Sequence, residues 1–424
     1  MLIPSIDLLD GRAVQLRQGR DLVLDLGDPR PLAERFAPFG EIAVVDLDAA
    51  RGTGSNATLV RELLGRARCR VGGGIRDRDT ARRWLDDGAE RLIVGTRATP
   101  EFLSSLPRDR LLAAVDARDG EVVVEGWTRG TCESAATRIA ELRDHVGGFL
   151  VTFVEVEGTL AGFELARAES LLRVAGDVRV TFAGGIASVD EIAALDRIGA
   201  DAQVGMALHA APGRPALDPA DCLWACLRSD RPDGLVPTAV CDRSGQLLSL
   251  AYSDRESLRV AAGERRGAYR SRTRGLWRKG ETSGARQRLL AIDADCDRDT
   301  LRFVVEPEGP ACHAGTPTCF GPLRGLAALD RRLRAGCMDD PASYTARLRR
   351  EPELLADKLR EEADELAVAV SREAVVAEAA DVAFFSAVKL ASVGASVADV
   401  DDELTRRARR VTRRGGERKG GPRP

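Results

Sequence analysis

Residues 1–212 repeat one pattern that few folds can accommodate. Short runs rich in aliphatic and β-branched residues alternate with longer stretches of helical period. Eight strand-like runs occur, at Leu2–Asp7, Ile42–Asp48, Cys69–Val71, Arg91–Gly95, Leu111–Asp116, Phe149–Val154, Val178–Ala183 and Ala202–Gly205. Eight strands, most of them followed by a helix, predict a parallel α/β architecture whose closed form is the (β/α)8 barrel. A doubly wound open sheet is the structural alternative, but it needs a topological switch point that the pattern does not indicate.

The sequence changes character twice after this region. Residues 213–233 contain Pro215, Pro219 and Pro232, follow directly on Pro212 and show little periodicity, so we expect a linker there. Residues 234–321 carry short strand-like runs separated by turns, which predicts a small α+β domain. Residues 322–408 have helical period, interrupted by turns at 339–342 and 393–396, and predict an all-α domain. The Arg-rich residues 409–424 are broken by glycine and proline and are expected to form a disordered tail.

Composition narrows the class of protein. A chain of 424 residues is too long for one ordinary core. A net charge of −3 gives no global basic field for nucleic acid. No apolar run approaches the ~20 residues that span a bilayer, and the start lacks the pattern of a secretion signal. Nine unevenly spread cysteines do not resemble a disulfide scaffold. We therefore expect a cytoplasmic protein that binds neither nucleic acid nor membranes.

Two carboxylates mark a candidate catalytic site in the predicted barrel. Functional groups of this fold gather at the carboxyl ends of the strands. Asp7 and Asp116 end the first and fifth predicted strands, on opposite sides of the barrel mouth, and Thr152 ends the sixth. A pair of carboxylates in one cleft can supply the acid and the base of a proton-transfer reaction. The alternative is that each aspartate only caps the helix or turn that follows it.

Glycine pairs at other strand ends predict phosphate sites. Glycine lets backbone N–H groups approach an anion closely, and a following helix N-terminus favours negative charge. One group follows the third and fourth strands and another follows the seventh and eighth, which predicts a substrate with a phosphate at each end. The candidate residues are Gly73, Gly74, Gly95, Thr96, Gly184, Gly185 and Gly205.

The α+β region carries a candidate metal site. Asp295, Asp297 and Asp299 alternate along the chain, which places them on one side of an extended segment with Cys296 on the other. Carboxylate oxygens suit Mg²⁺, whereas thiolates suit Zn²⁺. Two more cysteines follow, so that a zinc set of Cys296, Cys312 and Cys319 is predicted beside a magnesium set. An ordinary acidic turn is the alternative.

Acidic residues at helical spacing mark a third candidate site. Within each group the acidic residues share a helical face. Glu378 and Asp381 also interrupt an apolar stretch, where burying a carboxylate without a partner would be costly. A solvated acidic face with local salt bridges is the alternative. The candidates are Glu361, Glu362, Glu365, Glu378 and Asp381.

The motifs of the first domain resemble those of phosphoribosylformimino-AICAR-phosphate (ProFAR) isomerase. They are Leu2-Ile-Pro-Ser-Ile-Asp7, Val45-Asp-Leu-Asp48, Val71-Gly-Gly-Gly-Ile-Arg-Asp77 and Val115-Asp-Ala-Arg-Asp-Gly120 with Gly126-Trp127. The resemblance implies an Amadori rearrangement, from aminoaldose to aminoketose, with Asp7 as general base, Asp116 as general acid and Thr152 in support. The Asp-Gly-Thr of the family is Glu157-Gly158-Thr159 here, so that this carboxylate sits one methylene further out. A dual-specificity barrel that also serves tryptophan biosynthesis stays open.

The second domain resembles phosphoribosyl-AMP cyclohydrolase. The motifs are Leu276-Trp-Arg-Lys-Gly-Glu-Thr-Ser-Gly284 and Gly309-Pro-Ala-Cys-His-Ala-Gly315, together with the aspartate-rich segment. The resemblance implies hydrolysis of a purine ring by Zn²⁺-activated water, with His313 left to move protons. It also implies a homodimer whose two chains share the zinc ligands. Two histidines of the family are replaced here by Ala268 and Ala285.

The third domain resembles phosphoribosyl-ATP pyrophosphatase. Ser343-Tyr-Thr-Ala-Arg347 and the two acidic motifs carry the resemblance, which implies carboxylates that hold Mg²⁺ against a triphosphate. These motifs also occur in other all-α nucleotide pyrophosphohydrolases, and the neighbouring cyclohydrolase-like domain favours the histidine enzyme. Together the three resemblances predict a multifunctional histidine-biosynthesis enzyme that binds phosphoribosyl nucleotides. The alternatives are a bifunctional enzyme whose weakened or dual-specificity barrel serves assembly, and a generic pyrophosphohydrolase fused to unrelated domains.

Overall fold

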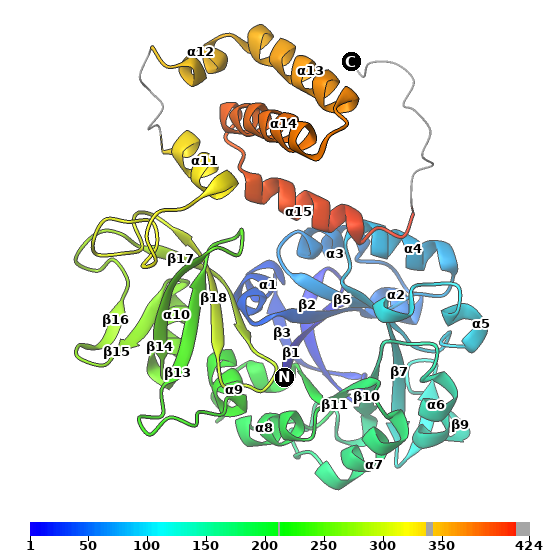
Figure 1. Cartoon of the computed structure of the whole chain (residues 1–424). Helices are drawn as coiled ribbons and strands as arrows, with labels where there is room; N and C mark the ends of the chain where they lie inside the picture. The colour runs from blue at the N-terminus through cyan, green and yellow to red at the C-terminus, as the bar shows by residue number, and fades with distance from the viewer. Residues whose placement is uncertain (211–212, 336–341, 413–424) are drawn as a thin grey trace.

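The chain forms three units, as Figure 1 shows for the computed structural model. The structure describes residues 1–210, 213–335 and 342–412. Residues 339–341 of the expected turn at 339–342 and residues 413–424 of the expected tail lie outside the described residues. Among the described residues, every helix is too short or too polar to cross a membrane.

The first unit is a closed barrel of eight parallel strands. Each strand pairs in parallel with the next along the chain, and Leu2 of the first lies opposite Ala202 of the last, which closes the ring. The (β/α)8 prediction is therefore confirmed, and the doubly wound alternative is wrong. The strands are β1 (Leu2–Leu9), β4 (Glu41–Asp46), β5 (Arg68–Gly72), β6 (Arg91–Val94), β7 (Leu111–Arg118), β10 (Gly148–Phe153), β11 (Arg179–Ala183) and β12 (Asp201–Val204).

Helices cover the outside of the barrel, and capping residues fix where they begin and end. Asp77 caps α4 by accepting a hydrogen bond from the backbone N–H of Thr80, and Gly88 ends that helix in a left-handed conformation. Ser188 and Glu191 form a capping box at the start of α8. The helices are α1 (Arg30–Phe36), α2 (Leu47–Arg51), α3 (Ala57–Leu64), α4 (Arg78–Asp87), α5 (Pro100–Leu103), α6 (Ala135–Leu142), α7 (Leu165–Ala175) and α8 (Val189–Arg197).

The barrel has two separate packed layers. A large core lies between the strands and the helices and includes Phe36, Phe149 and Phe182. A smaller core fills the inside of the barrel, where strands contribute Ile3, Ala43, Ile93, Leu112, Leu150 and Ala183. The barrel is therefore a packed scaffold that holds its strand ends rigidly.

Two β-hairpins that the sequence analysis did not predict extend the strands that carry Asp7 and Asp116. β2 (Arg12–Arg17) and β3 (Asp21–Gly27) follow β1, while β8 (Glu121–Val124) and β9 (Arg129–Ser134) follow β7. The turn between β1 and β2 at 10–11 and the turn between β7 and β8 at 119–120 are each made by an Asp-Gly pair in which both residues have positive φ. Asp-Gly is a strong hairpin signal, so the sequence did contain this information.

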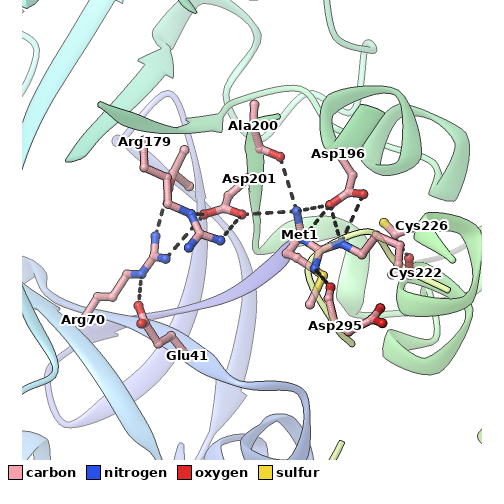
Figure 2. Close-up of polar contacts among 12 residues, drawn as sticks. Met1, Glu41, Arg70, Arg179, Asp196, Ala200, Asp201, Cys222, Cys226 and Asp295 are labelled. Carbon is pink, nitrogen blue, oxygen red and sulfur yellow. Dashed lines mark hydrogen bonds and ion pairs between the residues drawn. The ribbon is translucent and has the colours of Figure 1, made fainter. Parts of the chain in front are cut away.

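Charged side chains fill the amino end of the barrel (Figure 2). Arg70 is 1% exposed and donates to the carboxylate of Glu41 at 2.5 Å and to Thr181 Oγ1 at 2.8 Å. Asp201 lies 3.6 Å from the same guanidinium and pairs with Arg179 at 2.6 Å. Because buried charges are stable only when paired, this network accounts for the polar residues at the amino ends of the strands.

The expected linker is partly wrong, because residues 219–226 of it form helix α9 (Pro219–Cys226). Asp218 caps this helix and Pro219 occupies its first turn, where a proline fits without losing a hydrogen bond. One side of α9 packs on the barrel through Cys222 and Cys226. The other packs on the second unit through Leu223. The prolines that suggested a linker thus start a helix that joins two cores.

The second unit is an α+β domain, as predicted. Its four-stranded sheet has the order β14-β13-β18-β17, and β15 pairs with β16 in a separate hairpin. Its core contains Val240, Leu258, Ile292 and Phe303, and Phe39 of the barrel joins the same cluster. The elements are β13 (Val236–Cys241), β14 (Leu247–Ser253), α10 (Arg255–Glu264), β15 (Ala268–Ser271), β16 (Gly275–Arg278), β17 (Gln287–Ala294) and β18 (Leu301–Pro307).

The third unit is helical, as predicted, and its core is small. The buried residues of the cluster are Leu333, Leu348, Leu355, Phe385, Ala387 and Val388. The apolar side chains of Val368, Val376 and Leu404 are more than half exposed in the single chain. The helices are α11 (Gly325–Arg334), α12 (Tyr344–Arg350), α13 (Pro352–Val368), α14 (Arg372–Ser392) and α15 (Val397–Ala408).

Residues 409–412, the start of the expected disordered tail, lie against the barrel. Arg409 donates to Glu90 at 2.6 Å, and the backbone N–H groups of Val411 and Thr412 donate to Asp86 at 2.8 and 3.0 Å. For these four residues the expectation of disorder is wrong, because arginine and free backbone donors find acidic partners on the barrel.

Candidate active sites

A cavity of about 1000 Å³ opens at the carboxyl ends of the barrel strands. Asp7 of β1, Asp116 of β7 and Thr152 of β10 all line it. β1 and β7 lie on opposite sides of the ring, so the two carboxylates face the cavity from opposite directions. The structure thus brings together the three barrel residues that the sequence singled out for catalysis.

All the candidate phosphate-binding residues line the same cavity, in two opposed groups. One group follows β5 and β6, and the other follows β11 and β12. Gly73 has φ +95°, and a Cβ there would lie 2.1 Å from the carbonyl oxygen of Asp46. Gly184 has φ +94°, and a Cβ there would lie 2.4 Å from the carbonyl oxygen of Phe153. Only glycine fits at these two positions, so the strand ends present backbone to the cavity.

Burial raises the pKa values of both aspartates. For Asp7 the pKa rises to about 6, although a hydrogen bond from Ser5 Oγ at 3.1 Å acts in the opposite direction. For Asp116 burial also raises the pKa, against hydrogen bonds with Trp127 and Thr152. A carboxyl group whose pKa approaches neutrality can exchange protons during a reaction near pH 7.

Glu157 brings a third carboxylate to the cavity. Burial is the main cause that raises its pKa to about 7, and the nearby Asp7 adds to it. Its Oε2 atom is buried without a hydrogen-bond partner among the described residues. The structure therefore places the longer side chain of the Glu-Gly-Thr motif inside the site, next to the predicted base.

Glu157→Gln is expected to stabilise the protein at high pH more than at low pH. The pKa of Glu157 is raised above its ordinary 4.5, so its stabilising contribution is present below pH 4.5 and is lost as the pH rises through about 7. Glutamine does not ionise, and the variant therefore gains up to about 3 kcal/mol over the wild type once the wild-type carboxylate is charged. Thermal unfolding of both proteins at about pH 5 and about pH 8 tests this. A difference between them that does not change with pH would contradict it.

Basic side chains also line the cavity, and the sequence analysis missed them as site residues. They are suited to phosphate groups because guanidinium binds phosphate with two parallel hydrogen bonds. Arg76 and Arg97 each stand two residues after a candidate phosphate-binding glycine, Gly74 and Gly95, which is a signal that the sequence offered. The residues are Arg20, Arg51, Arg76, Arg97 and Arg138.

The two hairpins meet beside this cavity. Trp127, in the turn between β8 and β9, and Gly19, in the turn between β2 and β3, both line it. A Cβ at Gly19 would lie 2.9 Å from the ring of Trp127, so the indole packs directly on that turn. The hairpins therefore form part of the wall of the cavity.

The three aspartates of the second unit converge in the loop between β17 and β18. Asp295, Asp297 and Asp299 each offer an oxygen atom, and these atoms lie within 4.8 Å of one another. Asp295 Oδ1 accepts hydrogen bonds from the backbone N–H groups of Asp299 and Thr300, each at 3.1 Å. Although partial burial acts against it, these hydrogen bonds lower the pKa of Asp295. Three carboxyl oxygens at this separation suit a hard divalent cation.

The predicted cysteines divide into a pair and a single residue. The thiols of Cys312 and Cys319 interact directly. The backbone N–H of Ala314 donates to Cys312 Sγ at 3.5 Å, and this hydrogen bond is the main cause that lowers the pKa of Cys312. His313 Nδ1 lies 3.8 Å from the same sulfur. Cys296 is exposed on the acidic loop and forms no three-ligand group with this pair within the described part of one chain.

The helical unit brings part of its acidic set together. Glu362 and Glu365 of α13 and Glu378 of α14 each offer an oxygen, all within 4.8 Å. Glu362 is 9% exposed, and burial followed by the nearby Asp381 raises its pKa. Glu361 instead forms a salt bridge with Lys358 at 2.8 Å. For this residue the alternative of a solvated acidic face with local salt bridges therefore holds.

One argument for this site is wrong in its detail. Asp381 was expected to be buried because it interrupts an apolar stretch, yet it is exposed. The apolar stretch is itself partly exposed in one chain, since Val376 of α14 is 58% exposed. Apolar residues along a helix are buried only where another surface packs against them, and within one chain this face of α14 is not fully covered.

Comparison with known families divides the chain in the same way. Residues 1–212 match the family model "Histidine biosynthesis protein", residues 249–321 match "Phosphoribosyl-AMP cyclohydrolase", and residues 326–408 match "Phosphoribosyl-ATP pyrophosphohydrolase". These three matches fall on the barrel, the α+β unit and the helical unit, respectively.

Individual relatives cover parts of the chain. An imidazole-4-carboxamide isomerase of Methanosphaerula palustris is 40% identical over an alignment of 223 residues, and the match covers 49% of this chain and 93% of that protein. The histidine biosynthesis trifunctional proteins of Neurospora crassa and Komagataella pastoris are 43% and 45% identical over 194 and 203 residues. These matches cover 46% and 47% of this chain but only 22% and 24% of the two relatives.

The family match of the barrel extends over half of the chain, and the isomerase relative is covered almost completely. The cavity, with its opposed aspartates and glycines, lies inside the matched region. The chain belongs to the family of histidine biosynthesis proteins.

Proposed function

We propose that the chain is a trifunctional enzyme of histidine biosynthesis. Its helical unit releases pyrophosphate from phosphoribosyl-ATP, its α+β unit opens the purine ring of phosphoribosyl-AMP, and its barrel isomerises the resulting ProFAR. The observation that carries this proposal is the barrel cavity, where two opposed carboxylates stand between two opposed glycine groups. The family models on the other two units supply the two preceding steps.

The barrel geometry suits an Amadori rearrangement. Asp116 gives a proton to the ring oxygen as the C1–O bond of the sugar breaks, and Asp7 removes the proton from C2. The enol that results returns to a ketone at C2 while C1 gains a proton, so the product is an isomer and no atom is lost. The glycine groups and the arginines at the two ends of the cavity bind the phosphates, which fixes the sugar between the two aspartates.

The α+β unit offers donors for Zn²⁺ and Mg²⁺. Cys312 and Cys319 supply two neighbouring thiols, and the three aspartates supply a separate set of hard oxygens. A zinc ion would lower the pKa of a bound water and so supply the nucleophile for ring opening. His313 would move protons at that position.

The described cysteines are all free, in keeping with a reducing compartment such as the cytoplasm.

A second copy of the chain would complete the zinc site. Zinc sites use four ligands, and one chain brings only two of the predicted thiols together. β14 is an edge strand of its sheet, and its backbone at Leu248 accepts a hydrogen bond from Cys319. Leu250 on this strand and the adjacent Phe320 are 58% and 65% exposed. We therefore place a homodimer contact at this edge, where Cys296 of the second copy reaches the pair.

The helical unit suits a triphosphate with Mg²⁺. Burial, followed by the negative charges of neighbouring carboxylates, raises the pKa values of Glu362 and Glu378, and a divalent cation would remove this repulsion. Asp381 lies close enough to add to it. The carboxylates would hold the cation against the phosphates, which positions the substrate for attack by water.

Glu362→Gln is expected to lower pyrophosphate release by about 10²-fold or more and to raise the Mg²⁺ concentration that the step needs. The variant removes the most buried carboxylate of the cluster. Asp364→Asn is the matched control, because Asp364 is exposed on the same helix and lies outside the cluster. Pyrophosphate release is measured with phosphoribosyl-ATP and with other nucleoside triphosphates.

Two results would argue against this assignment. Normal release by the Glu362 variant would show that the acidic face is merely solvated surface. Equal release by the wild type from unrelated nucleoside triphosphates would favour a generic pyrophosphohydrolase instead.

A further inference from the structure

The acidic loop of the α+β unit is attached to the barrel by one ion pair. Arg298, in the middle of the loop, donates to Asp196 of α8 through Nε and Nη2, at 3.3 to 3.4 Å. Asp196 is 8% exposed and stands at the amino end of the barrel, the end opposite the cavity. Figure 2 shows Asp196 and Asp295 within the same group of polar contacts. The two residues of the pair are 102 positions apart in the sequence.

The same arginine shapes the loop. Arg298 Nη1 donates to the carbonyl oxygen of Asp295 at 2.8 Å, and the carbonyl oxygen of Arg298 accepts a hydrogen bond from the N–H of Arg228 at 2.7 Å. Arg298 has φ +69°, a conformation that a residue with a side chain seldom keeps unless its surroundings hold it. These two hydrogen bonds, one within the loop and one from the segment after α9, therefore hold the backbone turn on which the three aspartates converge.

Charge adds a second reason for this contact. The guanidinium of Arg298 lies in a loop with three carboxylates, and any of them could pair with it. Asp196 binds the guanidinium on the barrel side, so Asp295, Asp297 and Asp299 keep their oxygens close together. Without Asp196, the guanidinium would be free to pair with carboxylates of its own loop, and such a pair would compete with a cation.

We infer that Asp196 of the barrel is a positioning residue for the metal loop of the α+β unit, acting through Arg298. This inference rests on the proposed function, since it takes the three aspartates as a Mg²⁺ site. The barrel then serves two chemistries from its two ends: its carboxyl end holds the isomerase cavity, and its amino end orders the loop of the preceding enzyme. The contact between the two fused domains thus helps to form the metal site of the α+β unit.

The experiment measures Mg²⁺ binding at this loop alone, in the full-length chain. Amide hydrogen exchange of the peptide spanning residues 295–300 is followed as Mg²⁺ is added, which separates this loop from the helical unit. The variants are Asp196→Asn, Arg298→Ala and the double variant. Arg228→Ala is the matched control, because its exposed guanidinium lies 3.9 Å from the same Asp196 carboxylate and makes no side-chain contact with the loop. Isomerisation by each variant reports whether the barrel is intact.

Asp196→Asn and Arg298→Ala are each expected to raise the Mg²⁺ concentration for half-maximal protection by about 10-fold. The double variant is expected to be no worse than Arg298→Ala, because Arg298→Ala already removes the contact with Asp196. Arg228→Ala is expected to stay close to the wild type. Wild-type affinity in Asp196→Asn, or losses that multiply in the double variant, would overturn the inference. A wild-type loop that Mg²⁺ does not protect would overturn the proposed metal site and this inference with it.

Discussion

Asp7→Asn and Asp116→Asn are each expected to lower the rate of isomerisation by about 10²–10⁴-fold. Each variant keeps the size of the side chain and removes one of the two proton carriers. Burial raises the pKa of both carboxyl groups, to about 6 for Asp7, so that protons can be exchanged close to neutral pH. Asparagine can neither take up nor give such a proton.

The control for these variants is Asp119→Asn. Asp119 is exposed in the turn that follows β7 and has φ +51°, a conformation that asparagine tolerates. Each protein is assayed with ProFAR, and pyrophosphate release and ring opening are measured in parallel. These two steps are expected to stay near the wild type, because both aspartates lie at the carboxyl end of the barrel. An isomerisation rate within a few-fold of the wild type for either variant would refute their assigned roles.

Cys312→Ser is expected to abolish ring opening and to remove zinc from the protein. Cys312 has the lowered pKa of the cysteine pair, because the N–H of Ala314 donates to its sulfur, and a thiolate is the form that binds zinc. Loss of the metal removes the activated water itself, whereas loss of one acid–base group typically costs about 10²–10⁴-fold. The loss should therefore exceed the effect of any acid–base residue in this unit.

Metal analysis and the fate of phosphoribosyl-AMP test this prediction. The wild type is expected to contain about one Zn²⁺ per chain. Cys132→Ser is the control, since Cys132 is exposed on hairpin strand β9 of the barrel. Ring opening is expected in the wild type although Ala268 and Ala285 replace two family histidines, because the pair of thiols and His313 are retained. A zinc-free wild type that leaves phosphoribosyl-AMP unchanged would reduce the three enzymes to two.

The barrel could be predicted because its signal is local and repeated. Each strand-like run sits between helical stretches, and a parallel barrel places every strand end at one mouth, so Asp7 and Asp116 had to share it. The hairpins after β1 and β7 were not predicted, although an Asp-Gly pair begins each of them, because both lie in the connections between successive barrel strands, where the pattern indicated only helices and loops. Helix α9 was missed because proline marks both a linker and a first helical turn.

Contacts between distant segments could not be predicted. The pair of Asp196 and Arg298 joins residues of two different domains, and no periodicity relates them. That Cys296 forms no three-ligand group with Cys312 and Cys319 among the described residues of one chain likewise depends on the tertiary fold and not on the spacing of the cysteines. The exposure of Asp381 depends on whether another surface covers α14, which the spacing of apolar residues along a helix does not reveal.

The most direct test of the trifunctional account is to give phosphoribosyl-ATP to the purified full-length protein with Mg²⁺ and Zn²⁺. Products are separated by liquid chromatography before mass analysis, because ProFAR and its aminoketose isomer have the same mass. The account predicts release of pyrophosphate, transient phosphoribosyl-AMP and ProFAR, and final accumulation of the aminoketose. Accumulation that stops at phosphoribosyl-AMP or at ProFAR would contradict it.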